Sequence, residues 1–127
     1  MCDNYVTPLN LESDDITLGE LRKKHPNNLT LGYININSVR HKLQDLFEFV
    51  NKTINIVANA ETKINAKFPS SQFLIEGMKK PYRLDITDKS GGHLVYVDQN
   101  ISSVQIYPKS LKSSGIQTVV LEIKSQK

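Results

Sequence analysis

The sequence has little of what marks secreted, zinc-binding or membrane proteins. Its 127 residues include one cysteine, Cys2, which excludes an internal disulfide framework and a zinc site built from cysteines. No apolar run is long enough to span a membrane. The first residues also lack the basic and apolar regions of a signal peptide. We therefore expect an intracellular protein without a membrane partner.

The sequence also lacks a large excess of charge of either sign. There are 16 lysines and arginines against 13 aspartates and glutamates, which gives a net charge of +3 and a pI near 9.0. This mild excess is compatible with a polyanionic partner such as DNA but does not establish one. Hydrophobic residues make up 39% of the chain, enough for one globular domain with a core. The histidines, His25, His41 and His93, have no metal-ligand spacing.

The composition changes near residue 28, which divides the chain into an arm and a domain. Residues 1–28 have few core-forming positions and are predicted to be an arm with one short helix. That helix is expected to begin near Asp14 and run through Leu21, with Pro26 ending the segment. Residues 29–127 are predicted to form the folded domain.

The amphipathic pattern of the first part of this domain predicts strand, helix and strand. Leu29–Ile36 is rich in residues that favour strands. Ser38 is a suitable N-cap for a helix over 39–50, whose apolar residues recur at helical spacing. Ile54–Ala58 is a short apolar run, typical of a buried central strand. The order is that of a βαβ unit with two parallel strands.

The second part of the domain predicts short antiparallel strands. Apolar runs suggest strands over 72–75, 94–97, 104–107 and 117–123, with a turn around Asp98–Asn100. The intervening stretch over 79–92 is polar and rich in turn formers. Parallel and antiparallel strands with few helices predict an α/β (α+β) fold with a mixed sheet, in the form of an α/β sandwich.

Three polar residues at the ends of predicted strands are candidates for chemistry. Glu61 follows the second strand, where a carboxylate would face the loops at the sheet edge. Asn35 and Asn37 are unusual at the end of a strand and, at a spacing of two, should leave the same face. A purely structural role remains open for each residue. Glu61 could be a turn or helix cap, and the asparagines could be turn residues at the end of the strand.

The order of several short motifs resembles the endonuclease/exonuclease/phosphatase superfamily, and most closely the endonuclease domain of non-LTR (LINE-type) retrotransposons. In that branch a strand ends in an NINS-like segment, and a downstream strand leads into Glu-Thr-Lys. Later come an aromatic-Pro element, a Pro-Tyr-Arg-like stretch and a Gly-Gly pair before an apolar strand. The corresponding segments here are Ile34–Ser38, Glu61–Asn65, Phe68–Pro69, Pro81–Asp85 and Gly91–Val97.

The resemblance implies roles for these residues. Glu61 would ligate Mg²⁺, with Mn²⁺ as a substitute, and Asn35 would position the metal-bound carboxylate and the scissile phosphate. Asn37 would belong to the metal shell, at a position that holds an acidic residue in some other branches of the superfamily and often an amide in the retrotransposon-like branch.

Lys79, Lys80 and Arg83 would contact the DNA backbone, as phosphate-positioning groups do. A solvated loop is the alternative for these three. DNA as the partner would be compatible with a nuclear location.

The same mechanism needs an Asp-x-Asn element and an Asp-His pair that activates water, and we expect both to lie beyond Lys127. The chain would then be the amino-terminal half of a four-layer α/β sandwich, inactive alone. Strands such as Leu94–Val97 and Gln117–Ile123 would expose an apolar face that favours self-association. A non-catalytic remnant or binding module is the alternative. A phosphatase or phosphodiesterase acting on small substrates is disfavoured by the NINS, ETK and PYRLD segments.

Overall fold

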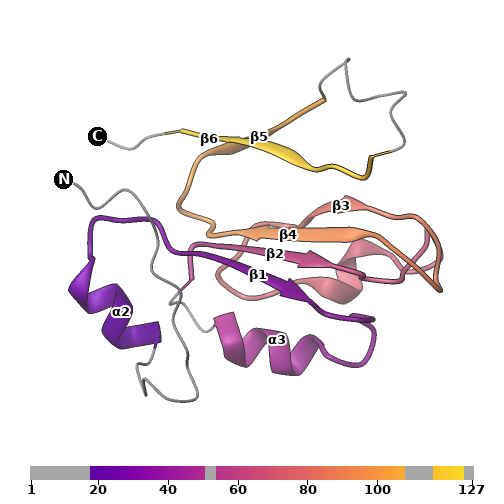
Figure 1. Ribbon diagram of the computed structural model, residues 1–127, viewed down its shortest axis with the longest axis horizontal. Coiled ribbons are helices and arrows are strands. Elements are labelled where there is room, and N and C mark those ends of the chain that lie inside the picture. The colour runs from indigo at the N-terminus through magenta and orange to yellow at the C-terminus, as the bar shows by residue number, and fades with distance from the viewer. Residues whose placement is uncertain (1–17, 51–53, 108–115, 125–127) are drawn as a thin grey trace.

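The computed structural model describes residues 18–50, 54–107 and 116–124, and it has an α+β fold. A mixed four-stranded sheet has the order β1-β2-β4-β3, and β5 and β6 form a separate antiparallel hairpin. Figure 1 shows α3 on one side of the sheet and the hairpin on the other. The elements are α2 (Leu18–Lys24), β1 (Leu31–Asn35), α3 (Leu43–Val50), β2 (Ile56–Ala60), the 3₁₀ helix η1 (Ser70–Phe73), β3 (Tyr82–Leu84), β4 (His93–Val97), β5 (Ser103–Ile106) and β6 (Val120–Ile123).

The predicted strand, helix and strand are confirmed as β1, α3 and β2. The two strands are parallel, with Leu31 opposite Ile56 and Asn35 opposite Ala60. β2 lies inside the sheet and is buried along most of its length, as its apolar composition predicts. It begins at Ile56, later than predicted, because Asn55 first uses its main chain and amide to bind Thr30.

The helix after β1 begins later than its apolar pattern predicts. Ser38 has a φ of 82° and is not an N-cap, and α3 starts only at Leu43. The N–H groups of Ser38 and Val39 instead donate to the carbonyls of Glu61 and Thr62, at 2.8 and 3.1 Å. The chain therefore continues to pair with the segment after β2 before it turns into the helix.

Two expectations for the middle of the chain are wrong. The segment predicted as a strand over 72–75 contains the end of η1, in which the Gln72 N–H donates to the Pro69 carbonyl at 3.0 Å. Its apolar residues Phe73 and Ile75 are buried all the same. The polar stretch over 79–92 contains β3, which pairs with β4 through Tyr82 opposite Val95. The pairing, rather than any apolar pattern, makes this segment a strand.

One face of the sheet packs against α3 and forms the larger core. β2 and β4 contribute alternate side chains to this face, among them Val57, Leu94 and Tyr96, each fully buried. α3 contributes Leu46 and Val50 from its buried side. The apolar periodicity of residues 39–50 therefore identifies the face of the helix that packs on the sheet.

The opposite face is covered in part by the β5–β6 hairpin. Val95 and Val97 on β4 are buried there, against Leu121 and Ile123 of β6. The expectation that β4 lacks a cover on this side is therefore wrong, because the hairpin folds back over it. At β1 the cover is missing: Leu31 and Tyr33 lie on the same face and are 68% and 69% exposed.

The amino-terminal part of the chain is described only from Leu18 onward, where α2 extends to Lys24. The start predicted for this helix near Asp14 lies outside the described residues. Among residues 18–50, 54–107 and 116–124, no helix has the length and apolar character needed to cross a membrane.

Candidate functional site

The candidate residues meet where the carboxyl ends of β1 and β2 lie side by side. The parallel pairing continues past both strands, with the Ile36 N–H donating to the Ala60 carbonyl at 3.0 Å and the Ser38 N–H to the Glu61 carbonyl at 2.8 Å. This pairing brings the segment that carries Asn35 and Asn37 alongside Glu61. We call residues 35–39 and 60–63 the strand-end edge.

The backbone at the strand-end edge is strained. Asn37, Ser38, Glu61 and Lys63 have φ values of 48°, 82°, 58° and 56°, and they are the positive-φ residues other than glycine in the described part of the chain. Each such residue costs on the order of 1–3 kcal/mol, and strain of this kind is concentrated at functional sites. All four lie in two adjacent segments, so the edge is held in place by the surrounding fold.

The Glu61 carboxylate is fixed by a glycine turn. The Gly91 N–H donates to its Oε2 at 3.1 Å, and the Lys63 N–H donates to the Gly91 carbonyl at 3.0 Å. Gly91 and Gly92 have φ values of 72° and 98°, a conformation that favours glycine. Only the Oε2 atom has a protein hydrogen bond among the described residues, so Oε1 can face a ligand.

There is no room for a side chain at position 92. A Cβ there would lie 2.4 Å from Oγ1 of Thr62, which is fully buried. The Gly92 N–H donates to Oε1 of Gln117, just before β6, at 3.2 Å. The hairpin layer thus contacts the turn that holds Glu61. Sequence reasoning missed Gln117, because a lone polar residue before a strand carries no signal of such a contact.

Two lysine side chains bind at the strand-end edge. Lys63 Nζ donates to Oδ1 of Asn37, and Lys42 Nζ donates to the carbonyls of Ile36 and Asn37, each at 2.8 Å. Two ammonium groups at this edge make it favourable for an anion such as a phosphate. Asn37 is engaged by Lys63 here, which leaves Glu61 the better candidate for a metal ligand.

Lys79 and Lys80, predicted to contact DNA, lie in different surroundings. Lys79 Nζ donates to Oγ of Ser103 at 3.2 Å, and the Tyr82 hydroxyl lies 2.7 Å from the same oxygen. This cluster connects the sheet to the first residue of β5. Lys80 is exposed, so its ammonium is open to solvent.

Arg83 is engaged in contacts within the fold. Its Nε lies 2.8 Å from Oδ1 of Asp85, and Nη2 donates to the Asn65 carbonyl at 2.8 Å. Nη1 donates to Ser70 Oγ at 3.2 Å, and the guanidinium lies 5.8 Å from the centre of the Phe73 ring. These contacts hold the loop after Lys63 against β3 and occupy one donor on each guanidinium nitrogen.

An Asp-x-Asn triplet does occur in this chain, at Asp98–Asn100. It follows Val97, which pairs with Ile56 at the beginning of β2, whereas Glu61 follows the end of β2. The triplet therefore lies at the opposite end of the sheet. The Asn100 N–H donates to Oδ1 of Asp98 at 2.9 Å, the local turn that the sequence predicts there.

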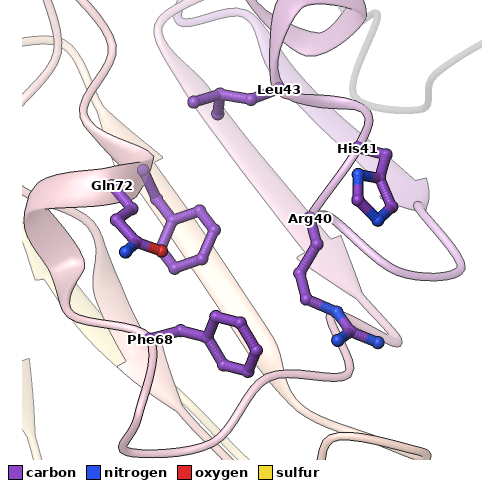
Figure 2. A pocket seen from close by; sticks show the side chains of 6 residues that line it. Arg40, His41, Leu43, Phe68 and Gln72 are labelled. Atoms are coloured by element: carbon purple, nitrogen blue, oxygen red, sulfur yellow. The ribbon is translucent and has the colours of Figure 1, made fainter.

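A cleft of about 350 Å³ separates the loop after the strand-end edge from η1 (Figure 2). Figure 2 shows Arg40, His41 and Leu43 on one wall and Phe68 and Gln72 on the other. The Arg40 guanidinium lies 5.2 Å from the centre of the Phe68 ring. No binding role was predicted for any of these residues, because their meeting depends on the packing of two loops, which no local pattern records.

The donor set at the strand-end edge fits a hard cation only in part. In the described ranges no three His, Cys, Asp or Glu side chains are grouped closely enough to hold a metal ion. Mg²⁺ often takes one or two carboxylates and fills its other positions with water and phosphate oxygens. Glu61, with one carboxylate oxygen free, meets that minimum and no more.

No protein-family model matches the chain, and no curated protein matches it at a significant level.

Proposed function

We propose that this chain is the amino-terminal part of a Mg²⁺-dependent DNA endonuclease domain of the endonuclease/exonuclease/phosphatase superfamily, of the type found in non-LTR retrotransposons. The observation that carries the proposal is the strand-end edge. Parallel pairing of β1 with β2 sets Asn35 opposite Ala60, next to Glu61. The order of motifs from Ile34 to Val97 supports the same family.

Glu61 is the residue that would hold Mg²⁺ or Mn²⁺. Its carboxylate is oriented by the Gly91 N–H, and a bound metal would supply Lewis-acid stabilisation of a phosphodiester under attack by water. The Asn35 amide would orient a metal ligand or a phosphate oxygen. Lys63 and Lys42 would attract the phosphate, a role for which the sequence alone had pointed to Lys79, Lys80 and Arg83.

A non-catalytic binding module is the second candidate. It is favoured by the lack of a three-residue metal cluster among the described residues and by the position of Asp98–Asn100 at the far end of the sheet. In that case the strand-end edge would retain phosphate affinity without cleavage. We expect the 127-residue chain alone not to nick DNA under either alternative.

A metal titration separates the proposal from its alternatives. Wild-type protein should gain thermal stability with rising Mg²⁺ or Mn²⁺, and Glu61→Gln should lose that gain while it keeps the same melting temperature in EDTA. Glu48→Gln, an exposed glutamate on α3, is the matched control and should respond like wild type. An equal metal response in wild type and Glu61→Gln would defeat the metal assignment. Nicking of supercoiled plasmid that disappears in Glu61→Gln would defeat the expectation of inactivity.

A further inference from the structure

The cleft between Arg40 and Phe68 has no role in the metal site. Glu61 and Asn35 do not line it, and its walls are the segment after Val39 and the segment from Phe68 to Phe73. Both segments continue from the strand-end edge, one after Asn37 and one after Lys63. A nucleic-acid strand whose phosphate lies at this edge would therefore have the cleft beside it.

The cleft presents planar groups. The Arg40 guanidinium lies over the Phe68 ring, with its Cζ 5.2 Å from the ring centre. Phe68 is half-buried and Arg40 is exposed, so this stacked pair remains partly accessible. Aromatic rings and guanidinium planes are the surfaces on which the bases of single-stranded nucleic acids stack. A flexible aliphatic ligand would bind here no more tightly than on any flat apolar surface.

The polar side chains of the cleft have unused hydrogen-bonding groups. Within the described residues, the side chains of Arg40, His41 and Gln72 have no hydrogen-bond partner, and all three residues are exposed. The Gln72 amide can both donate and accept, as the edge of a base requires. Among the residues that the structure places in its walls, none is acidic, so these walls do not oppose a ligand that carries a phosphate.

We propose that this cleft binds a nucleobase of a single-stranded or locally opened nucleic-acid strand. Phe68 and Arg40 provide the stacking surface, Gln72 contacts the base edge, and His41, on the same wall as Arg40, contacts the neighbouring phosphate. This proposal rests on the proposed function only for the identification of the strand as DNA. Base binding itself requires no metal.

The test compares two single-stranded DNA oligomers of equal length and charge, one with bases throughout and one with abasic sites at its centre. Binding to the full 127-residue chain is measured by fluorescence anisotropy in EDTA. Because stacking of one base typically carries roughly fivefold or more in affinity, we expect wild type to prefer the complete oligomer by about that factor. Equal affinity for the two oligomers would mean that only phosphate charge is recognised, and would overturn the proposal.

Substitutions of cleft residues test whether the base binds in the cleft. Phe68→Leu should lose the preference for the complete oligomer, while its affinity for the abasic oligomer stays unchanged. Phe47 is an exposed phenylalanine on α3, and Phe47→Leu should keep the preference. Arg40→Ala alters an exposed side chain, so it tests the same surface without risk to the core, and it should reduce the preference. A preference that persists in both Phe68→Leu and Arg40→Ala would overturn the cleft assignment.

Glu61→Gln separates this proposal from the metal site. The variant should keep the full base preference in EDTA, because Glu61 does not line the cleft. A missing Mg²⁺ response in wild type with an intact base preference would reject the metal site and support the cleft. Loss of the base preference in Glu61→Gln would instead move base recognition to the strand-end edge and overturn the assignment to the cleft.

Discussion

The two faces of the four-stranded sheet are closed in different ways. The face toward α3 is covered by a helix that connects two strands of the sheet it packs on, and its side chains Val57, Leu94 and Tyr96 are fully buried. The opposite face is covered by the β5–β6 hairpin over β4 (Figure 1). Leu31 and Tyr33 of β1 remain exposed.

The difference follows from how each cover is connected. A crossover helix between parallel strands packs on the sheet that it joins, so the first face is closed by local sequence. The second face depends on a hairpin whose two strands are separated in sequence from β1 and do not reach it. The apolar strip formed by Leu31 and Tyr33 on β1 therefore stays exposed.

A matched pair of valines tests this difference and should give the largest effect. Val57→Ala on the α3 face is expected to lower the free energy of unfolding by about 2–3 kcal/mol, because a tightly packed core relaxes little around a cavity. Val97→Ala on the hairpin face should cost about 1 kcal/mol less, since the hairpin can move inward. Urea unfolding measures both. An equal or larger loss at Val97 would show that the two faces are equally well packed.

Tyr96 extends the comparison to a polar group inside the first face. Its hydroxyl donates to the Phe73 carbonyl at 2.6 Å, and burial raises the pKa of this hydroxyl. Tyr96→Phe should cost about 1–3 kcal/mol near neutral pH, because the carbonyl loses its partner.

The pH dependence of Tyr96 has a definite sign. Above about pH 10 the unfolded tyrosine ionises while the folded one stays neutral, so its contribution to the free energy of unfolding falls as pH rises through this window. Urea titrations at about pH 8 and about pH 11 should therefore show a smaller stability loss with pH in Tyr96→Phe than in wild type. An identical pH dependence in the two proteins would contradict the assignment.

Gln117 links the hairpin layer to the strand-end edge. Gln117→Ala removes the acceptor of the Gly92 N–H and should cost about 0.5–1.5 kcal/mol. It should also weaken the Mg²⁺ response of the protein, because the same turn orients Glu61. Gln117→Glu keeps an acceptor at this position and serves as the control. A full metal response in Gln117→Ala would show that the Gly91–Gly92 turn holds Glu61 without help from the hairpin.

The exposed strip on β1 should give the smallest effect on stability. Leu31→Ser and Tyr33→Ser are expected to change the free energy of unfolding by no more than about 0.5 kcal/mol, as substitutions at exposed positions usually do. They should reduce self-association measured by sedimentation velocity, because they remove exposed apolar surface. Lys80→Ser, at another exposed position, is the control. Unchanged association in both β1 variants would exclude this strip as the contact.

Part of the fold follows directly from local patterns. The apolar spacing over 39–50 predicted the buried side of α3, and the apolar run at Ile54–Ala58 predicted a central strand. The turn at Asp98–Asn100 was also predictable, since its hydrogen bond lies within the turn itself. β3 could not be predicted, because its side chains show no periodicity and its strand geometry depends on β4.

The sequence named the residues of the candidate site but not their arrangement. The motifs singled out Asn35, Asn37 and Glu61, and the parallel register brings their segments together. The fixing of the Glu61 carboxylate by Gly91, the contact from Gln117 and the cleft beside η1 all join segments that are distant in sequence. No local pattern records such contacts, because each residue type is ordinary in its own loop.

The sequence by itself determined the α+β class, the parallel β1–α3–β2 unit and the identity of the carboxylate at the end of β2, because these depend on periodicity and on residues adjacent in the chain. Only the tertiary structure decided where α3 begins, which lysines bind at the strand-end edge, and how the second face of the sheet is covered. Those features depend on hydrogen bonds and packing between distant segments, which compete with local preference and prevail once the core is formed.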